Sequence, residues 1–169
     1  MSKIELRAFE KGDVDWLVDA HARLYAQDEG FDDTFGPLVR AILTDYFANR
    51  DPDLERGWLA QSADQRLGSI FCVKGAPGRA KLRLFLVDPG ARGMGLGKLL
   101  LKTCMDHAAT HGFTGMDLWT HESHRAACAL YAKTGWRLVR SEPVYSFGQD
   151  LVEQSWSIDF PLAPTQSRA

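Results

Sequence analysis

The chain has 169 residues, of which 45% are hydrophobic and 25% charged, and its formal net charge is −2. This balance is ordinary for a globular protein and gives no basic footprint for nucleic acid or anionic lipid. No apolar run approaches the roughly 20 residues of a membrane-spanning helix, and the N-terminus lacks a secretory signal. We therefore expect a cytoplasmic protein with a single domain at 1–160 and a loose tail at 161–169.

The three cysteines favour the same compartment. Cys72, Cys104 and Cys128 are widely spaced and form no C-x-x-C pair. They are therefore expected to be reduced core thiols rather than a disulfide framework or a metal site.

The first half of the chain alternates between strand and helix patterns. Apolar and polar residues alternate over 4–8, and apolar residues recur at helical spacing after Gly12 and again after Thr34. An acidic loop at 28–33 separates the two helical patterns. The predicted elements are a strand at 4–8, helices at 12–27 and 34–50, and strands at 57–60 and 67–73.

The stretch 82–98 combines a strand, a glycine-rich turn and a helix start. Leu82, Leu84 and Leu86 alternate with Arg83, Phe85 and Val87, which predicts one face of a strand. Asp88-Pro89-Gly90 ends it, and a helix to about residue 111 follows. The turn leaves main-chain N–H groups without partners at a helix N-terminus, and Arg92 and Lys98 add positive charge. This pattern predicts a phosphate-binding cradle.

The spacing of the glycines distinguishes between three kinds of phosphate-binding turn. A dinucleotide fingerprint would need a third glycine at Lys98 or Leu100. A P-loop would need glycine at Arg92 and a hydroxyl at Leu99. The pattern that fits is R-x-x-G-x-G at 92–97, directly after Val-Asp-Pro.

The second half supplies the remaining elements. A strand is expected at 116–119, a helix at 122–133 closed by Gly135, and strands at 137–139, 145–147 and 156–160. Short turns make most neighbours antiparallel, and the unit 82–120 should be a right-handed parallel crossover. We therefore expect an α/β (α+β) fold with a mixed, mostly antiparallel sheet and helices on both faces.

Two motifs resemble signatures of the GCN5-related N-acetyltransferase (GNAT) superfamily. One is the R-x-x-G-x-G turn, and the other is the segment 126–136, similar to A-x-x-L-Y-x-x-x-G-F with Trp136 as the last residue. The order of elements from 4 to 160 is also that of the superfamily. Residues 146–156 look like a branch often fused behind a MarR-type helix-turn-helix repressor. No such part precedes Ile4, so transcriptional regulation is not carried over.

The resemblance implies the GNAT fold, acetyl-coenzyme A as cofactor and specific site residues. Tyr131 matches the tyrosine that often protonates the coenzyme sulfur; by itself it would read as a core tyrosine. The implied cofactor-binding residues are Leu86 and Val87 for pantetheine, the turn residues Arg92, Gly93, Met94, Gly95, Leu96, Gly97 and Lys98 for pyrophosphate, and Ala126 in the second motif.

The sequence departs from the family pattern in two places. His121 stands where many members have an asparagine that touches pantetheine; it could substitute as a donor or only cap a strand. The strand at 82–87 also lacks the glutamate that often serves as base. Glu29 in the acidic loop is the first candidate for that role, with a solvated surface loop as the alternative.

These observations predict an enzyme that transfers acetyl directly to a primary amine of a small molecule or peptide. The alternative is an acyl-coenzyme A sensor without turnover. The absence of a carboxylate from the strand at 82–87 favours the sensor, whereas the presence of Tyr131 favours the enzyme. Edge strands after residue 137 are compatible with a homodimer.

Overall fold

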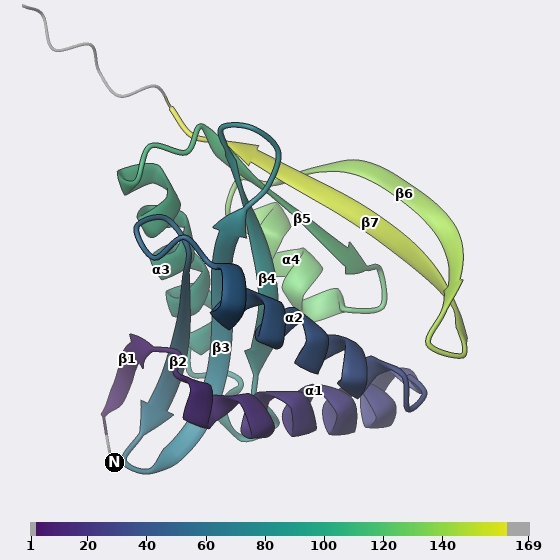
Figure 1. The fold of residues 1–169 in the computed structure, drawn as a ribbon. Helices are drawn as coiled ribbons and strands as arrows, with labels where there is room; N and C mark the ends of the chain where they lie inside the picture. The colour runs from purple at the N-terminus through teal and green to yellow at the C-terminus, as the bar shows by residue number, and fades with distance from the viewer. Residues whose placement is uncertain (1–2, 162–169) are drawn as a thin grey trace, which may run out of the picture.

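The computed structural model describes residues 3–161, which form one seven-stranded sheet flanked by helices (Figure 1). Most of the predicted tail therefore lies outside the described residues. Two short 3-10 turns, Lys11–Asp13 and Pro89–Ala91, precede α1 and α3. The elements are β1 (Ile4–Ala8), α1 (Val14–Glu29), α2 (Phe35–Asn49), β2 (Arg56–Ser62), β3 (Gln65–Lys74), β4 (Arg79–Val87), α3 (Leu96–Thr110), β5 (Gly115–His121), α4 (Arg125–Lys133), β6 (Arg137–Ser146) and β7 (Gln149–Asp159).

The sheet is mixed and mostly antiparallel, as predicted. Its strand order is β1-β2-β3-β4-β5-β7-β6, and only the β4–β5 pair is parallel among the described strands. The helix between these two strands, α3, makes the expected crossover. No helix within residues 3–161 combines the length and apolar character needed to cross a bilayer.

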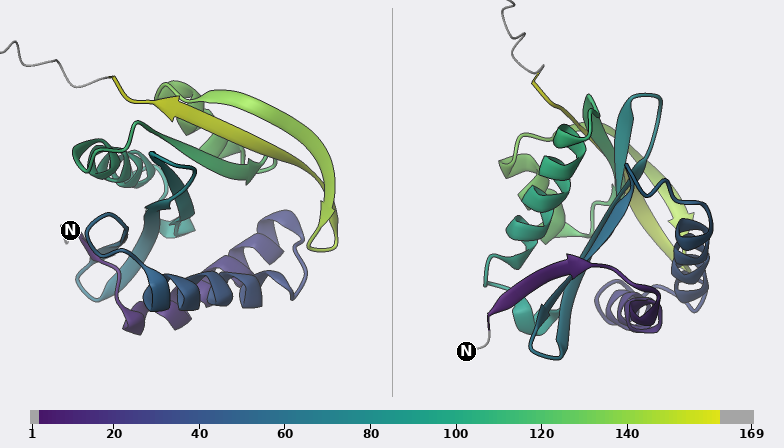
Figure 2. Two further views of the ribbon diagram at one scale, coloured as in Figure 1. Left: turned by 45° about the horizontal axis from the view of Figure 1, so that its top comes forward. Right: turned by 60° about the vertical axis from the view of Figure 1, so that its left-hand side comes forward.

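Helices cover both faces of the sheet (Figure 2). One apolar cluster joins α1 and α2 to the first face through residues such as Leu17, Leu43 and Phe71. A second cluster joins α3 and α4 to the other face through residues such as Leu100, Met116 and Trp136. Two separate apolar layers therefore hold the sheet between them.

Strand β4 contains a bulge that the sequence pattern did not reveal. Ser69 on β3 is opposite Leu86, whereas Phe71 is opposite Arg83, so Leu84 and Phe85 share one partner position. Leu84 has a φ of 50°, in the left-handed region. The predicted single face of Leu82, Leu84 and Leu86 is therefore wrong: Leu82 packs in the α3–α4 layer, and Leu84 and Leu86 pack in the α1–α2 layer. An extra residue in a strand reverses the facing of every residue beyond it.

Strands β4 and β5 pair over a short stretch and then diverge. Their register comprises only Arg79↔Gly115, Ala80↔Met116 and Lys81↔Asp117. Beyond Lys81 the remainder of β4 has no strand partner on this side. The sheet is therefore open in its middle, next to the C-terminal end of β4.

The end of the chain forms two long strands instead of the three short ones predicted. Strands β6 and β7 pair along their whole length and are joined at Phe147 and Gly148, whose φ angles are 53° and 74°. Positive φ at both loop residues is typical of a type I′ hairpin turn, but Phe-Gly lacks the usual Asn-Gly signal. Pro143 interrupts the apolar pattern and is tolerated because β6 is an edge strand.

The tip of this hairpin contacts the loop between α1 and α2, and we call this contact the clasp. The main-chain N–H of Asp32 donates to the oxygen of Phe147 at 2.9 Å, and Gln149 Nε2 donates to Gly30 O at 3.0 Å. The rings of Phe31 and Phe147 stack with centroids 4.9 Å apart. The clasp thus connects the two halves of the chain across the open part of the sheet (Figure 1).

Candidate active site

The turn between β4 and α3 presents an anion-binding surface. Gly93 and Gly95 have φ angles of 80° and 77°, and a Cβ added to either would meet nothing within 4 Å. The first helical bond of α3 runs from Leu99 N to Gly95 O at 3.0 Å, so the N–H groups of the first turn have no partner within the helix. These donors and the helix dipole point outward at an exposed site.

The side chains around this turn divide between the surface and the core. Arg92, Met94 and Lys98 are exposed, and the Arg92 guanidinium lies 3.6 Å from Asp28 Oδ2. Leu96 is buried, so only its main chain can serve a ligand. A Cβ on Gly97 would lie 3.6 Å from Leu130, an ordinary van der Waals distance, so the packing of α3 on α4 does not require glycine at this position.

The free edge of β4 leads from this turn into the molecule. Leu86 and Val87 pair with Ser69 and Gly68 of β3 on one side only. Their opposite side faces the open part of the sheet, where β5 has diverged. An extended chain with amide groups could hydrogen bond there as an added strand does.

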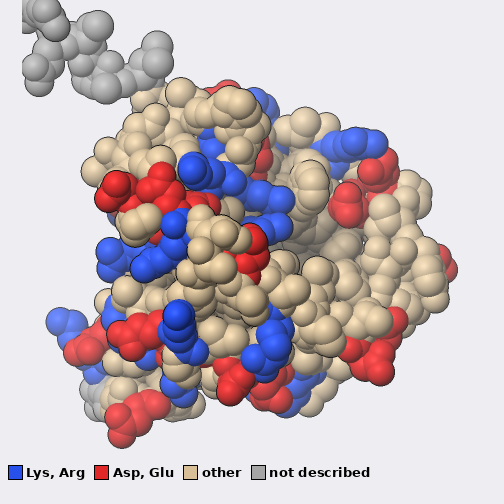
Figure 3. All heavy atoms as spheres, viewed as in Figure 1, with Lys and Arg blue, Asp and Glu red and all other residues tan. Residues whose placement is uncertain are grey.

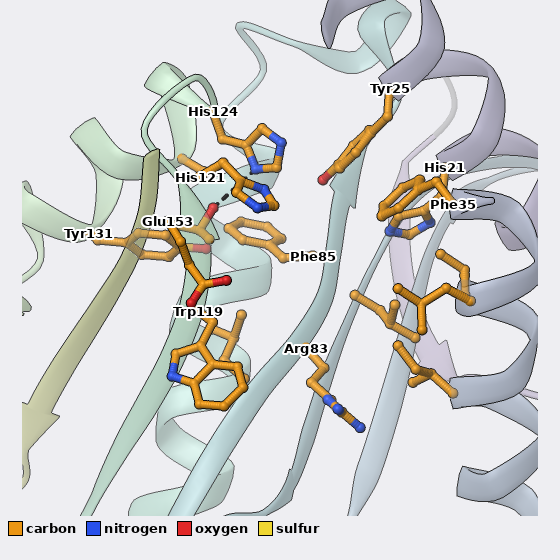
Figure 4. Close-up of a pocket in the computed structure, with 17 residues that line it drawn as sticks. His21, Tyr25, Phe35, Arg83, Phe85, Trp119, His121, His124, Tyr131 and Glu153 are labelled. Atoms are coloured by element: carbon orange, nitrogen blue, oxygen red, sulfur yellow. Dashed lines mark hydrogen bonds between the residues drawn. The ribbon is translucent and has the colours of Figure 1, made fainter. Parts of the chain in front are cut away.

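A cavity of about 210 Å³ lies where the strands diverge. Its walls come from α1, α2, β4, β5, α4 and β7, and Figure 4 shows side chains from both sides pointing into it. Leu38 and Ile42, two of the apolar residues that recur at helical spacing after Thr34, form part of the α2 wall. The lining residues are His21, Tyr25, Phe35, Leu38, Val39, Ile42, Leu82, Arg83, Leu84, Phe85, Trp119, Thr120, His121, His124, Ala127, Tyr131 and Glu153.

Tyr131 reaches this cavity from α4. Tyr131 is 3% exposed, and its ring packs near the rings of Phe85, Trp136 and Trp156. Within residues 3–161 its hydroxyl has no hydrogen-bond partner. Burial raises the pKa of this hydroxyl well above its ordinary value, so the group stays protonated at neutral pH.

Comparison with known proteins explains this combination of turn, open strand and cavity. The acetyltransferase (GNAT) family profile matches residues 14–136. The chain belongs to the GNAT family. Mycothiol acetyltransferase from Clavibacter sepedonicus is 31% identical over 134 residues, which cover 79% of this chain and 43% of that protein. The chain thus spans less than half the length of this relative.

Solved GNAT structures share the fold at low sequence identity. A GNAT-family acetyltransferase from Staphylococcus aureus superposes with a TM-score of 0.75 at 18% identity, covering 93% of this chain and 99% of the other. The ribosomal-protein-S18-alanine N-acetyltransferase from Escherichia coli gives 0.73 at 16% identity, covering 99% and 100%. These likenesses confirm the predicted GNAT fold.

The three histidines of the cavity are neutral at pH 7. Burial lowers the pKa of His21 and of His124 to about 4. Burial and the nearby His124 also lower the pKa of His121. Each ring is therefore a hydrogen-bonding group rather than a fixed cation in this GNAT cavity.

Glu29 lies behind the cavity and does not line it. Its side chain is 8% exposed, it accepts a hydrogen bond from Ser123 Oγ at 2.5 Å, and its Oε2 lies 3.2 Å from His124 Nε2. On its other side the His124 ring contacts Thr120 Oγ1 through Nδ1 at 3.0 Å. Glu29 thus reaches the cavity through His124. Asp28 and Asp32 of the same loop have other partners, Arg92 and Thr34.

The cavity also contains residues that the sequence did not single out. Glu153 on β7 is opposite His121 on β5, and it is the one carboxylate among the lining residues. Tyr25 points its hydroxyl toward the histidines, with its ring 4.7 Å from that of His124 (Figure 4). Ala126, predicted in the cofactor site, is exposed in the first turn of α4, whereas its neighbour Ala127 lines the cavity.

No sequence motif marks Glu153 or Tyr25. Glu153 becomes a cavity residue only through the β5–β7 register, which pairs residues 32 positions apart. Within residues 3–161 no group of three or more His, Cys, Asp or Glu side chains is placed to hold a metal ion. The three cysteines are free thiols, two of them buried.

Proposed function

We propose that this chain transfers the acetyl group of acetyl-coenzyme A directly to a primary amine of a small molecule or peptide. The observation that carries the proposal is the sequence of three features along β4: an outward anion cradle after its end, its unpaired edge, and a cavity lined by Tyr131. One elongated ligand with anionic phosphates, amide groups and a reactive end would meet all three in order. Acetyl-coenzyme A has these groups in that order.

The residues of the chain suit this ligand. Arg92, Lys98 and the N–H groups of the turn supply positive potential for the pyrophosphate. The main chain of Leu86 and Val87 is available to the pantetheine amides, and Ala126 is exposed at the start of α4. His121 lies at the end of β5 as a neutral donor or acceptor. When bound, the cofactor would supply an activated acetyl thioester at the cavity.

Tyr131 is proposed to donate a proton to the departing sulfur. A carbon–nitrogen bond forms, the carbon–sulfur bond breaks, and the sulfur leaves as a thiol once it receives the tyrosine proton. The high pKa of the buried hydroxyl keeps the proton in place until negative charge develops beside it. The resulting phenolate is then reprotonated from solvent or from the amine.

The amine must lose its own proton, and Glu153 and His121 face the cavity where this would occur. Glu153 attracts an ammonium ion, and neutral His121 can accept a proton. Glu29 remains part of the proposal in a changed position, because its carboxylate lies 3.2 Å from His124 Nε2 behind the cavity. A homodimer stays a prediction; the exposed Leu138, Val139 and Tyr145 on edge strand β6 are where it would be sought.

Release of free thiol from acetyl-coenzyme A across a panel of amines tests the proposal. Coenzyme A should also raise the melting temperature, by an amount that follows its concentration. NAD and ATP should stabilise much less, and equal stabilisation by either would contradict the cradle assignment. Coenzyme A binding without thiol release for any amine would instead favour an acyl-coenzyme A sensor.

A further inference from the structure

Two opposite charges without partners face the same cavity. Arg83 comes from β4, and Glu153 comes from β7. Both side chains belong to partly buried residues. Among residues 3–161, neither makes a hydrogen bond or an ion pair, whereas Arg7, Arg66 and Arg79 on the same sheet are all paired with aspartates.

An unpaired charge in a partly buried position lacks the compensation that a partner would provide. Arg83 cannot reduce this cost by losing its proton, because a guanidinium stays charged in proteins. Lys81 does not line the cavity, and its ammonium lies 4.2 Å from the ring centroid of Trp119. The charged residues that line the cavity are therefore Arg83 on the β4 side and Glu153 on the β7 side.

The wall between the two charges is apolar and aromatic. Leu38, Val39 and Ile42 of α2 face Phe85 and Trp119 across the cavity. Figure 4 shows Glu153 close to His121 and Trp119, and Arg83 on β4 pointing away from Glu153. Strand β5 lies between β4 and β7, so the two charges are separated by two inter-strand spacings of about 4.8 Å each or more.

We infer that the acceptor is an apolar amine that carries an anionic group, such as a carboxylate, at the end remote from its amine. This inference rests on the proposed function and names its acceptor class. The ammonium would meet Glu153 on the side of Tyr131, the apolar body would fill the aromatic space, and the anion would pair with Arg83. Polycationic amines are disfavoured, because a second positive charge would meet Arg83.

Three rigid probes with the same nucleophile test the inference. Benzylamine, 4-(aminomethyl)benzoate and 4-(aminomethyl)benzylamine carry a neutral, negative and positive group, respectively, opposite the same aminomethyl group. The kcat/KM for acetylation should be about tenfold or more higher for the benzoate than for benzylamine, and lowest for the diamine. Equal values, or a preference for the diamine, would overturn the inference while leaving acetyl transfer established.

Variants of Arg83 assign the preference to this residue. Arg83→Gln should bring the ratio of kcat/KM for the benzoate to kcat/KM for benzylamine down to about one, mainly by raising the KM for the benzoate. Arg83→Lys should keep part of the advantage, and Arg23→Gln on the exposed face of α1 serves as the matched control. A benzoate advantage that survives in Arg83→Gln would contradict the assignment.

Calorimetric binding of the probes in the presence of coenzyme A separates this inference from the proposed function. If no probe is acetylated, tighter binding of the benzoate that depends on Arg83 still supports the charge pattern. Equal binding of all three probes would reject it. The thermal stability of each variant shows that a loss of preference does not come from unfolding.

Discussion

The hydroxyl of Ser69 on β3 donates a 2.7 Å hydrogen bond to the main-chain oxygen of Leu84 on β4. This bond lies inside the bulge, where the regular ladder between the two strands is interrupted. Ser69 is fully buried, and Leu84 adopts a left-handed backbone conformation. The pair therefore stabilises a strained strand segment that forms one wall of the cavity.

Ser69→Ala should lower the free energy of unfolding by about 1–3 kcal/mol, because the oxygen of Leu84 would lose its donor in a buried place. Chemical denaturation measures the change, with Ser141→Ala on the exposed part of β6 as control. Equal stability of Ser69→Ala and the parent would mean that the bulge does not depend on this bond.

Tyr131→Phe keeps the ring and its contacts with Phe85 and Trp136 but removes the acidic proton. We expect kcat to fall roughly 10²–10⁴-fold, while coenzyme A affinity and melting temperature stay close to those of the parent. Steady-state kinetics and calorimetry provide the two measurements. Unchanged turnover would make Tyr131 a packing residue only.

Arg92→Ala should weaken coenzyme A binding, because it removes a charge-assisted contact worth about 1.5–3 kcal/mol. Asp28→Asn should strengthen coenzyme A binding, because Asp28 lies 3.6 Å from Arg92 and competes with the pyrophosphate for its guanidinium. Lys102→Ala, on the exposed side of the same helix α3, serves as control. Stronger coenzyme A binding in Arg92→Ala would contradict the assignment of this turn as the pyrophosphate site.

Glu29→Lys should lower the melting temperature, because it places an ammonium group in a site where the native side chain is 8% exposed and contacts His124. Glu29→Gln, which can still accept the hydrogen bond from Ser123, should cost much less stability. If the proposed support of His124 is correct, both variants should raise KM for the amine more than KM for acetyl-coenzyme A. Unaltered amine kinetics in both would remove Glu29 from the site.

Asp13 gives the fold a pH dependence of known sign. Burial by itself would raise its pKa, but hydrogen bonds from Arg7, the main chain of Glu10 and Arg66 outweigh burial and lower the pKa to about 2. The unfolded carboxyl binds its proton near pH 3.8, so the ionised group stabilises the fold above that pH. This contribution is lost as the pH falls toward 2.

The contribution of Asp13 above pH 5 is about 2 kcal/mol by linkage. Asp13→Asn should therefore be less stable than the parent at pH 7, and the difference should shrink between pH 4 and pH 2. Urea unfolding of both proteins at pH 7, pH 4 and pH 2 measures this difference in stability. A difference that stays constant with pH would show that the loss is one of packing and not of charge.

The sequence predicted the parts of this protein that depend on local spacing. The R-x-x-G-x-G turn, the helix after it and the order of elements as far as α4 follow from glycine positions and apolar periodicity, and the structure confirms them. The bulge at Leu84 was missed because an inserted residue leaves no local signal in an apolar strand. The β6–β7 hairpin was missed because Phe147-Gly148 lacks the residues that usually mark such a turn.

The charges of the cavity were missed for a different reason. Arg83 and Glu153 are far apart in the chain and are brought together by strand order and register, which depend on the whole sheet. Glu29 was selected for its loop, but the final turn of α1 directs its carboxylate toward Ser123 and His124. Local patterns were enough to predict a site for the cofactor, which stays a prediction, whereas the charges on the acceptor side required the three-dimensional structure.

The clasp has a consequence for how this protein could diversify. Its contacts, from Asp32 to Phe147 and from Gly30 to Gln149, set how closely the α1–α2 pair approaches the β5–β7 side. None of these four residues is part of the cavity wall. A change in the length of the hairpin tip would therefore widen or narrow the cavity and leave Tyr131 and the glycine turn in place. In such a protein the choice of acceptor can evolve separately from the chemistry performed on it.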